Sequence, residues 1–340
     1  MNNYIGRVRK RGRTLLIVEG NHEKNELFKS IFRCFPEMNI NMKDVWIYQT
    51  NIYVLYNHIV EEYGAEWTED DIDLPFIISK TKKDFITCYK DDFTNIFLIF
   101  DYEHHDPKFS EDKILQMQNY FMDSTDVGKL YINYPMIESY QHLIAIPDIS
   151  YAEKKVPVSM EPGSKYKDLV RKETVIAQYI EFPDKIGALL NKKFGINDNQ
   201  ICQQCCEELL KLSNTENIED KIQDILKDKM EEKKLKTAKY QMLHLISEIG
   251  YAHNGESYWK YMRKIFQQII VFNICKANRI QIGKYAVEIG DYMRYFEEIS
   301  LIEILEIQNE SSRGYENGFI WVLNTCVFLV AEYNFALVME

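Results

Sequence analysis

Two apolar segments of this chain end abruptly in acidic residues. Residues 14–18 (TLLIV) run into Glu19, and residues 96–100 (IFLIF) run into Asp101 and Glu103, which are separated by one position. Short apolar runs of this kind are typical of buried strands. Carboxylate oxygens are the protein ligands that Mg²⁺ prefers, and Mn²⁺ accepts the same donors. The two segments therefore predict one shared carboxylate site that binds Mg²⁺ or Mn²⁺.

A divalent cation between these carboxylates would serve phosphate chemistry. A bound metal polarises phosphate oxygens and lowers the pKa of water, which suits cleavage of phosphodiester bonds. Asp101 and Glu103 can both lean toward one cation because the chain turns at the end of a strand, and Glu19 could share it or act as a general acid or base. Acidic residues also follow strands simply because loops are polar, and for any single residue that explanation is the better one. The joint pattern favours a functional site.

The order of the expected elements places these acids at one edge of a sheet. Apolar strands are predicted over residues 14–18, 45–48, 96–100 and 130–132, with helices between them. This alternation predicts an α/β fold with a mainly parallel sheet flanked by helices. In such a sheet, ligands bind beyond the carboxyl ends of the strands. Four acids fall at or just past such ends: Glu19, Asp101, Glu103 and Glu138.

The composition changes in the middle of the chain. Residues 147–163 contain three prolines and end in Gly163, which predicts a linker. From about Tyr166 onward the apolar pattern has the helical period. We therefore expect a catalytic α/β domain over residues 1–150, followed by a mainly helical domain over residues 151–340 that binds substrate or a partner.

Three short motifs together resemble the TOPRIM fold. This fold is shared by type II and type IA topoisomerases, bacterial primases, and the OLD-like and RloB-like nucleases of phage defence. Its first motif, an apolar strand followed by Glu-Gly, is matched at Glu19-Gly20, and its second, Asp-x-Asp after a strand, is matched at Asp101-Tyr102-Glu103. Nuclease branches often carry an Asn-Pro-like turn followed by Glu, and residues 133–138 (NYPMIE) look like a variant of it. The resemblance covers residues 14–143.

The resemblance implies roles for four carboxylates. Glu19 would be a general acid or base or a metal ligand, Asp101 and Glu103 would be metal ligands, and Glu138 would be an accessory ligand. Glu103 stands where the family has Asp, and its longer arm moves the carboxylate outward. The implied function is that of a nuclease that hydrolyses DNA or RNA as the effector of a prokaryotic antiviral defence system. The sequence contains no Gly-x-x-x-x-Gly-Lys-Ser/Thr pattern, so an ATPase sensor would be a separate chain.

Several basic residues are candidates for contacting phosphate. They lie directly after the second motif, beyond the expected linker and before the first strand: His104, His105, Lys165, Lys167, Arg11 and Arg13. An exposed loop explains each histidine slightly better, and a solvated basic arm explains the arginines equally well. The two lysines could stabilise phosphate charge, as a basic residue does in several nuclease branches.

Composition limits the class of protein. The chain has 340 residues, 46% of them hydrophobic, and a formal net charge of −11. This charge argues against a broad surface that coats nucleic acid, but not against an enzyme that holds a few phosphates. Seven scattered cysteines favour a reducing compartment, and we expect a cytoplasmic protein. The apolar segment 319–339 is interrupted by Asn324, Glu332 and Asn334, which favours a buried element over a membrane span.

Two other functions stay open at this point. The acidic site could be degenerate, in which case the chain would be a non-catalytic interaction or regulatory subunit whose helical half binds other subunits. A homo-oligomer is compatible with either function. A topoisomerase or primase is the weaker alternative, because no tyrosine can be singled out as the nucleophile that cleaves a strand.

Overall fold

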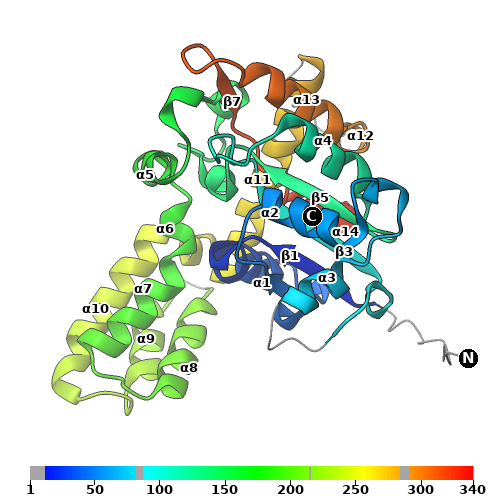
Figure 1. Cartoon of the computed structure of the whole chain (residues 1–340). Helices are drawn as coiled ribbons and strands as arrows, with labels where there is room; N and C mark the ends of the chain where they lie inside the picture. Colours follow the sequence, from blue (N-terminus) through cyan, green and yellow to red (C-terminus); the bar gives the residue numbers. More distant parts are fainter. Residues whose placement is uncertain (1–11, 82–86, 214–215, 284–290, 340) are drawn as a thin grey trace, which may run out of the picture. The chain divides into compact units, whose positions relative to one another are not determined.

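Five strands form the main sheet in the part of the chain that the structure describes. The structure is a computed structural model, and it describes residues 12–81, 87–213, 216–283 and 291–339. The strand order is β2-β1-β3-β5-β4, and all neighbours are parallel except β4 and β5. Figure 1 labels the three central strands β1, β3 and β5. The strands are β1 (Thr14–Val18), β2 (Val45–Ile47), β3 (Asn95–Asp101), β4 (Met122–Asp123) and β5 (Gly128–Asn133). The predicted α/β class with a mainly parallel sheet is confirmed.

The parallel register brings three strand ends to one edge of the sheet. Val18 at the end of β1 is level with Ile99 on β3, and Asp101 at the end of β3 is level with Asn133 at the end of β5. The strands β1 and β3 are buried along nearly their whole length, as expected of apolar strands inside an α/β sheet. The chain leaves all three strands at the same edge, which we call the carboxyl edge.

Helices connect these strands (Figure 1). After β1 the chain forms a π-helical turn (Glu23–Phe28) that continues into α1 (Lys29–Cys34), and later come α2 (Ile52–Tyr63), α3 (Leu74–Thr81) and α4 (Glu111–Tyr120). Side-chain oxygens of Asn51 and Ser110 accept hydrogen bonds from backbone N–H groups in the first turns of α2 and α4, at 3.1 and 3.4 Å. Such caps satisfy N–H groups that have no partner within the helix, and they fix where each helix begins.

The chain divides into two compact units that do not follow the expected boundary. Unit 1 contains Met1–Leu143, Pro147–Glu173 and Ile269–Glu340, and unit 2 contains Ile144–Ile146 and Thr174–Gln268. A single division at residue 150 is therefore wrong, because the chain returns to unit 1 after the helical part. Helical periodicity could not show this return, since α11 (Tyr258–Ile282) is one continuous helix that contributes to both units.

Residues 147–163 belong to unit 1 and are not the linker that their prolines suggest. They contain a 3₁₀ turn (Ile149–Glu153), the short strand β6 (Lys155–Pro157) and a second 3₁₀ turn (Val158–Met160). The strand β6 pairs in antiparallel fashion with β7 (Phe319–Trp321). Both strands are edges of a two-stranded sheet, where proline is tolerated. The proline signal therefore marked irregular structure inside a unit rather than a boundary.

Unit 2 is built from helices. They are α6 (Ala177–Ile180), α7 (Phe182–Ala188) with a following π-helical turn (Leu189–Lys193), α8 (Asn199–Leu210), α9 (Ile218–Leu226), α10 (Glu232–Ile249) and the first residues of α11. Apolar side chains at helical spacing are buried in it, among them Leu209, Ile222 and Met242. The helical pattern that the sequence predicts for this stretch is confirmed.

The C-terminal segment packs against the main sheet of unit 1. Further helices complete the described part of this unit: α5 (Ser164–Glu173), α12 (Tyr292–Glu297), α13 (Leu301–Ser311), α14 (Phe328–Tyr333) and α15 (Ala336–Met339). Between β7 and α14, Leu323 exchanges backbone hydrogen bonds of 2.8 and 2.9 Å with Tyr134, just past β5. Most of the apolar segment is buried in this way. Among the described residues, no helix combines the length and the apolar character needed to cross a membrane.

Candidate active site

Glu19 and Asp101 meet at the carboxyl edge. Glu19 follows β1 directly, and Asp101 is the last residue of the neighbouring strand β3. One carboxylate oxygen of Glu19, Oε2, accepts a hydrogen bond of 3.2 Å from the backbone N–H of Asp101. The structure therefore brings together the two carboxylates on which the predicted site depends.

Asp101 is a buried carboxyl group with incomplete hydrogen bonding. Its exposed fraction is 4%, and its Oδ1 has no hydrogen-bond partner among the described residues. Burial raises the pKa of Asp101 well above its ordinary value, and the negative charges of Glu19, Glu23 and Glu138 raise it further. An unpaired charge in such a place is unfavourable. A bound cation would satisfy this oxygen and remove the penalty.

Glu19 has a similar electrostatic environment. Burial raises the pKa of Glu19 well above its ordinary value, and the negative charge of Glu103 raises it further. The N–H of Asp101 and the ammonium of Lys167 act in the opposite direction. A carboxyl group with a raised pKa holds a proton at a higher pH than an ordinary glutamic acid and can release it during a reaction. Glu19 is therefore suited both to acid–base chemistry and to metal binding.

Glu103 has an unusual backbone conformation just beyond β3. Its φ angle is +40°, in the left-handed region that residues with a Cβ rarely adopt. Nδ2 of Asn51 donates hydrogen bonds to Oε2 of Glu103 at 3.2 Å and to Oδ2 of Asp106 at 2.8 Å. Because Oδ1 of Asn51 also caps α2, both ends of this amide are fixed. The contact holds the Glu103 carboxylate in place and supports the left-handed turn.

Glu138 lies in the 3₁₀ turn Ile137–Gln141 that follows β5, with an exposed fraction of 6%. Its Oε1 pairs with the ammonium of Lys167 at 3.0 Å and lies 3.7 Å from Nε2 of His22. Its Oε2 has no hydrogen-bond partner among the residues that the structure describes. Glu138 thus joins the other acids together with one of the two candidate lysines. The other, Lys165, is exposed and forms an ion pair of 3.5 Å with the glutamate four positions before it.

The turn that carries Glu138 is anchored by the C-terminal segment. Nδ2 of the fully buried Asn324 donates to the carbonyl oxygen of Ile137 at 3.0 Å and to Oγ of Ser139 at 3.1 Å. The backbone N–H of Asn324 in turn donates to Oδ1 of Asn273 on α11, at 2.8 Å. A residue 187 positions away along the chain therefore fixes this part of the site.

Glu23 is a residue of this cluster that the sequence motifs did not single out. Its exposed fraction is 4%, its Oε2 accepts a hydrogen bond of 2.8 Å from the N–H of Gly20, and burial raises its pKa. A Cβ on Gly20 would lie only 3.2 Å from this oxygen, which favours glycine directly after Glu19. Its spacing in the sequence could have identified Glu23, because an acid four residues after Glu19 falls in the first turn of the following helix.

His104 and His105 make their contacts away from the carboxylates. The ring of His104 packs on that of Phe109, with ring centroids 4.6 Å apart, and burial lowers the pKa of His104. His105 is exposed, and its Nε2 lies beside Gly163 just before α5, 3.4 Å from where a Cβ would be. The structure therefore gives His104 a packing role and places His105 next to α5.

Arg13, one of the two arginine candidates, does not reach this site in the structure. Arg13 precedes β1, at the opposite edge of the sheet, where its Nε and Nη2 donate to Oδ1 of Asp44 at 3.0 and 2.5 Å. The whole of β1, about 16 Å of extended chain, separates Arg13 from Glu19. Arg13 therefore does not lie beside the carboxylates, and its phosphate role stays a prediction. Arg11 lies outside the described residues.

The carboxyl edge offers the oxygen donors that a hard divalent cation needs. Oδ1 of Asp101 and Oε2 of Glu138 are buried and lack hydrogen-bond partners among the described residues. Carboxylate oxygens of this kind suit Mg²⁺ and Mn²⁺. Within the same part of the chain, no group of three or more His, Cys, Asp or Glu side chains is arranged to hold a metal ion. The residue types therefore fit a magnesium site, while their side chains are not gathered into one coordination shell.

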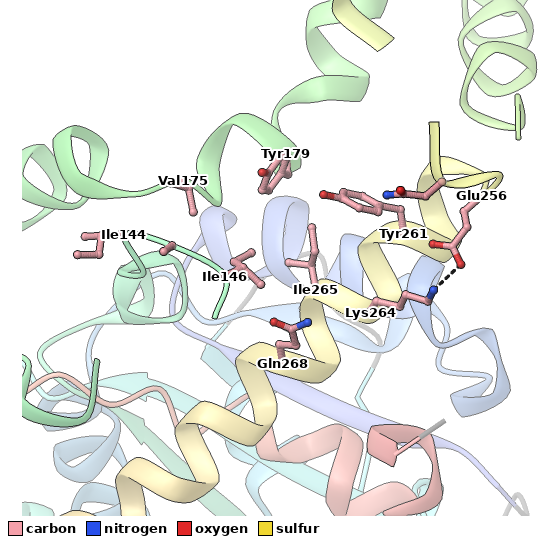
Figure 2. Close-up of a pocket in the computed structure, with 11 residues that line it drawn as sticks. Ile144, Ile146, Val175, Tyr179, Glu256, Tyr261, Lys264, Ile265 and Gln268 are labelled. Atoms are coloured by element: carbon pink, nitrogen blue, oxygen red, sulfur yellow. Dashed lines mark ion pairs between the residues drawn. The ribbon is translucent and has the colours of Figure 1, made fainter. Parts of the chain in front are cut away.

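A separate pocket lies in unit 2 and contains none of these residues. Its volume is about 720 Å³, and its lining includes Ile144, Tyr179, Glu256, Tyr261 and Lys264 (Figure 2). Glu256 and Lys264 form an ion pair of 2.5 Å, and the rings of the two tyrosines meet edge to face. Because its buried acid is paired with a lysine, this pocket lacks the unsatisfied carboxylate that marks the carboxyl edge.

The chain matches no protein-family model, no curated protein and no solved structure. The assignment of a function therefore depends on the chemistry of the site. That chemistry consists of acid–base groups and oxygen ligands at the carboxyl ends of parallel strands, which is where such sheets bind their ligands.

Proposed function

We propose that this chain is a metal-dependent nuclease that hydrolyses phosphodiester bonds in DNA or RNA through a TOPRIM-like site. The observation that carries the proposal is the buried and incompletely bonded Asp101 beside Glu19. Strongly shifted pKa values in groups that face one another are typical of functional sites. Folding alone gives no reason to bury several acids together, whereas a divalent cation bound between them would make the arrangement favourable.

The residues of the carboxyl edge divide the work in this proposal. Asp101 and Glu103 hold the cation with help from Glu138. Glu19 shares the cation or keeps a proton ready for the oxygen that leaves. Lys167, whose ammonium is 3.0 Å from Glu138, gives the site a positive charge that attracts a phosphate oxygen. When bound, Mg²⁺ would polarise the phosphate and activate a water molecule.

The proposal includes a biological setting, a prokaryotic antiviral defence system with a separate ATPase partner. This part is supported only by the likeness of the motifs at Glu19, Asp101 and Glu138 to those of OLD-like and RloB-like nucleases. Its test is stimulation of cleavage. A true partner would raise the cleavage rate in the presence of ATP and leave it unchanged when ATP is omitted.

Cleavage assays on matched variants test the nuclease itself. Wild type, Glu19→Ala and Asp101→Asn would be incubated with plasmid, single-stranded DNA and total tRNA, each with Mg²⁺, Mn²⁺ or EDTA. We expect metal-dependent cleavage of at least one substrate and its loss in both variants. Glu256→Gln is the control, because Glu256 is a buried and ion-paired carboxylate of unit 2. Cleavage that survives Asp101→Asn, or that continues in EDTA, would exclude this site.

A non-catalytic regulatory subunit is the second candidate. Two observations favour it: Glu103 replaces the aspartate of the family motif, and Lys167 already neutralises Glu138. A lysine ammonium can take the place of a metal in a site that has lost its cation. Calorimetric titration of Mn²⁺ into wild type and Asp101→Asn separates the two candidates, because only the nuclease requires metal binding that this substitution removes.

A further inference from the structure

The two-stranded ribbon of β6 and β7 has an outer face that the proposed site does not use. In its antiparallel register Lys155 is opposite Trp321, and Pro157 is opposite Phe319. Directly opposed residues share one face of a sheet, and the middle pair of this ribbon is buried on the other face. The outer face therefore consists of two aromatic rings, a proline and a lysine.

Lys155 lies over both aromatic rings of this face. Its Nζ is 3.9 Å from the ring centroid of Trp321 and 4.2 Å from that of Phe319, and the two rings meet edge to face with centroids 5.6 Å apart. Lys155 is exposed, so its flexible side chain can move aside without disturbing the core. The rings would then offer a flat apolar surface, and the ammonium would remain close enough to bind an anion beside it.

The position of Trp321 is fixed by the rest of unit 1. Nε2 of Gln308 donates to its carbonyl oxygen at 2.9 Å, and Oε1 of the same amide accepts from its N–H at 3.0 Å. Two residues further along, Leu323 is bonded to Tyr134, in the segment that leads from β5 to Glu138. Two extended residues span about 7 Å, so the ribbon begins close to the carboxyl edge.

An exposed positive charge lies on this ribbon although the chain as a whole is acidic. The chain has a net charge of −11, yet the ammonium of Lys155 lies over the Trp321 ring. The ammonium of Lys276, 4.9 Å from the same ring centroid, is buried and donates to the carbonyl oxygens of Tyr151 and Lys154, so the charge offered to a ligand is that of Lys155. A stackable ring beside positive charge suits a ligand that combines flat rings with negative charge. Nucleic acid has both in every nucleotide.

We propose that this outer face binds an unpaired strand of nucleic acid and guides it to the carboxyl edge. Stacking on an aromatic side chain requires a base that is free of its partner, so a closed duplex does not qualify, and stacking tolerates any base. The lysine binds the adjoining phosphate. The inference depends on the proposed nuclease function and narrows its substrate to single strands. Base stacking and a phosphate contact do not involve the 2′-hydroxyl, so DNA and RNA strands share the chemistry that is recognised.

Binding measured without turnover tests this inference. Fluorescence anisotropy in EDTA would compare labelled oligo(dT), oligo(rU) and a blunt duplex of equal length. We expect wild type to prefer both single strands over the duplex. Phe319→Leu and Trp321→Leu should weaken single-strand binding roughly tenfold or more. Lys155→Ala should reduce the slope of log K against the logarithm of salt concentration by about 0.7, the value for one lost phosphate contact on a single strand.

Lys80→Ala is the matched control, because Lys80 is also exposed and lies over a phenyl ring, that of Phe76 at 5.4 Å. Thermal unfolding of each variant shows whether it still folds. If Phe319→Leu or Trp321→Leu does not fold, the exposed substitution Lys155→Glu still tests the inference. A duplex bound as tightly as a single strand, or single-strand binding unchanged in Lys155→Glu, would overturn the inference. Failure to bind either single strand would overturn it as well.

The inference and the nuclease proposal can fail separately. Asp101→Asn should abolish cleavage and leave single-strand binding in EDTA unchanged, since Asp101 is not part of the ribbon. Metal-dependent cleavage of closed duplex, without any preference for unpaired strands, would remove this inference and leave the nuclease in place.

Discussion

Two buried aspartates at opposite edges of one sheet have opposite surroundings. Asp44, just before β2, is 7% exposed and accepts two hydrogen bonds from the guanidinium of Arg13. Asp101, at the end of β3, is 4% exposed, faces other acids and keeps one oxygen without a partner among the described residues. The opposite edge of the sheet, where the parallel strands begin, is thus arranged for stability. The carboxyl edge keeps an arrangement that is unfavourable when its carboxyl groups are ionised and that a bound cation would relieve, and this difference is what points to function.

Removing each aspartate in turn should give the largest contrast, in cleavage. If Asp101 holds the cation, Asp101→Asn should lower the rate of nucleic-acid cleavage by about a thousandfold or more, because several kcal/mol of transition-state stabilisation is lost. Asp44→Asn should leave the rate of the folded protein nearly unchanged. Rates on one substrate at saturating Mn²⁺ would measure both, and equal losses would abolish the contrast between the edges.

The pH dependence of stability should also differ between the hydrogen-bonded His142 and the carboxyl groups of Glu19 and Asp101. Nδ1 of His142 lies 3.1 Å from the Tyr166 hydroxyl and Nε2 lies 2.8 Å from Glu173, and burial lowers the pKa of His142 to about 4. Between that pKa and the ordinary value near 6.5 the unfolded chain binds more protons, so stability falls as the pH falls through this window, by about 3 kcal/mol at most. Urea unfolding from pH 7 to 4 should show this fall, and His142→Gln should flatten it.

The raised pKa values of Glu19 and Asp101 act with the opposite sign. Both groups bind protons more tightly in the folded chain than in the unfolded one, so their contribution makes the metal-free protein less stable as the pH rises. Asp101→Asn should reduce this loss in EDTA, and Mn²⁺ should reverse it in wild type. A wild type whose stability in EDTA does not respond to Asp101→Asn at any pH would contradict the electrostatic account of the carboxyl edge.

Stability in EDTA should separate the two aspartates a second time. Asp44→Asn should destabilise the protein by about 2 kcal/mol, because a largely buried charge pair loses one partner while Arg13 stays partly exposed to water. Asp101→Asn should instead stabilise the metal-free protein near neutral pH. Urea midpoints of the two variants at one pH measure the difference, and a loss of stability in Asp101→Asn would mean that this carboxylate is compensated after all.

The smallest effect is expected for a residue that only supports the carboxyl edge. Asn51→Ala removes the bond to Glu103 and the cap of α2, so it should slow cleavage roughly tenfold and cost about 1 kcal/mol of stability. Asn51→Asp keeps the cap but places a second negative charge beside Glu103. Both variants lose the hydrogen bond to Glu103, but only Asn51→Ala loses the helix cap. A cleavage defect in both variants would therefore assign the effect on catalysis to the bond with Glu103 and not to the cap.

Local patterns were sufficient to predict the part of the site that lies on neighbouring strands. Apolar runs ending in Glu19 and Asp101 define β1 and β3, and two parallel neighbours must bring the residues at their carboxyl ends to one edge. Long-range partners could not be predicted in this way. Neither Asn324, which holds the turn of Glu138, nor the pairing of β6 with β7 leaves any periodic trace in sequence.

The differences between expectation and structure have physical causes as well. Arg13 belongs to a basic cluster near the motif in sequence, but β1 carries the chain across the whole sheet between Arg13 and Glu19. Proline-rich residues 147–163 looked like a boundary because proline disfavours regular structure, and a short edge strand tolerates it equally well. Glu23 was within reach, since its four-residue spacing from Glu19 places it at the start of the following helix.

The anchoring of Glu138 by Asn324 has a consequence for synthesis of the chain. A ribosome makes the main strands first, but the turn after β5 lacks its hydrogen bonds to Asn324 until residue 324 has emerged, nearly 190 residues later. Throughout that interval Glu19, Asp101 and Glu138 have been synthesised, but Asn324, which positions the turn of Glu138, has not. The proposed site would therefore be completed only late in synthesis of the chain.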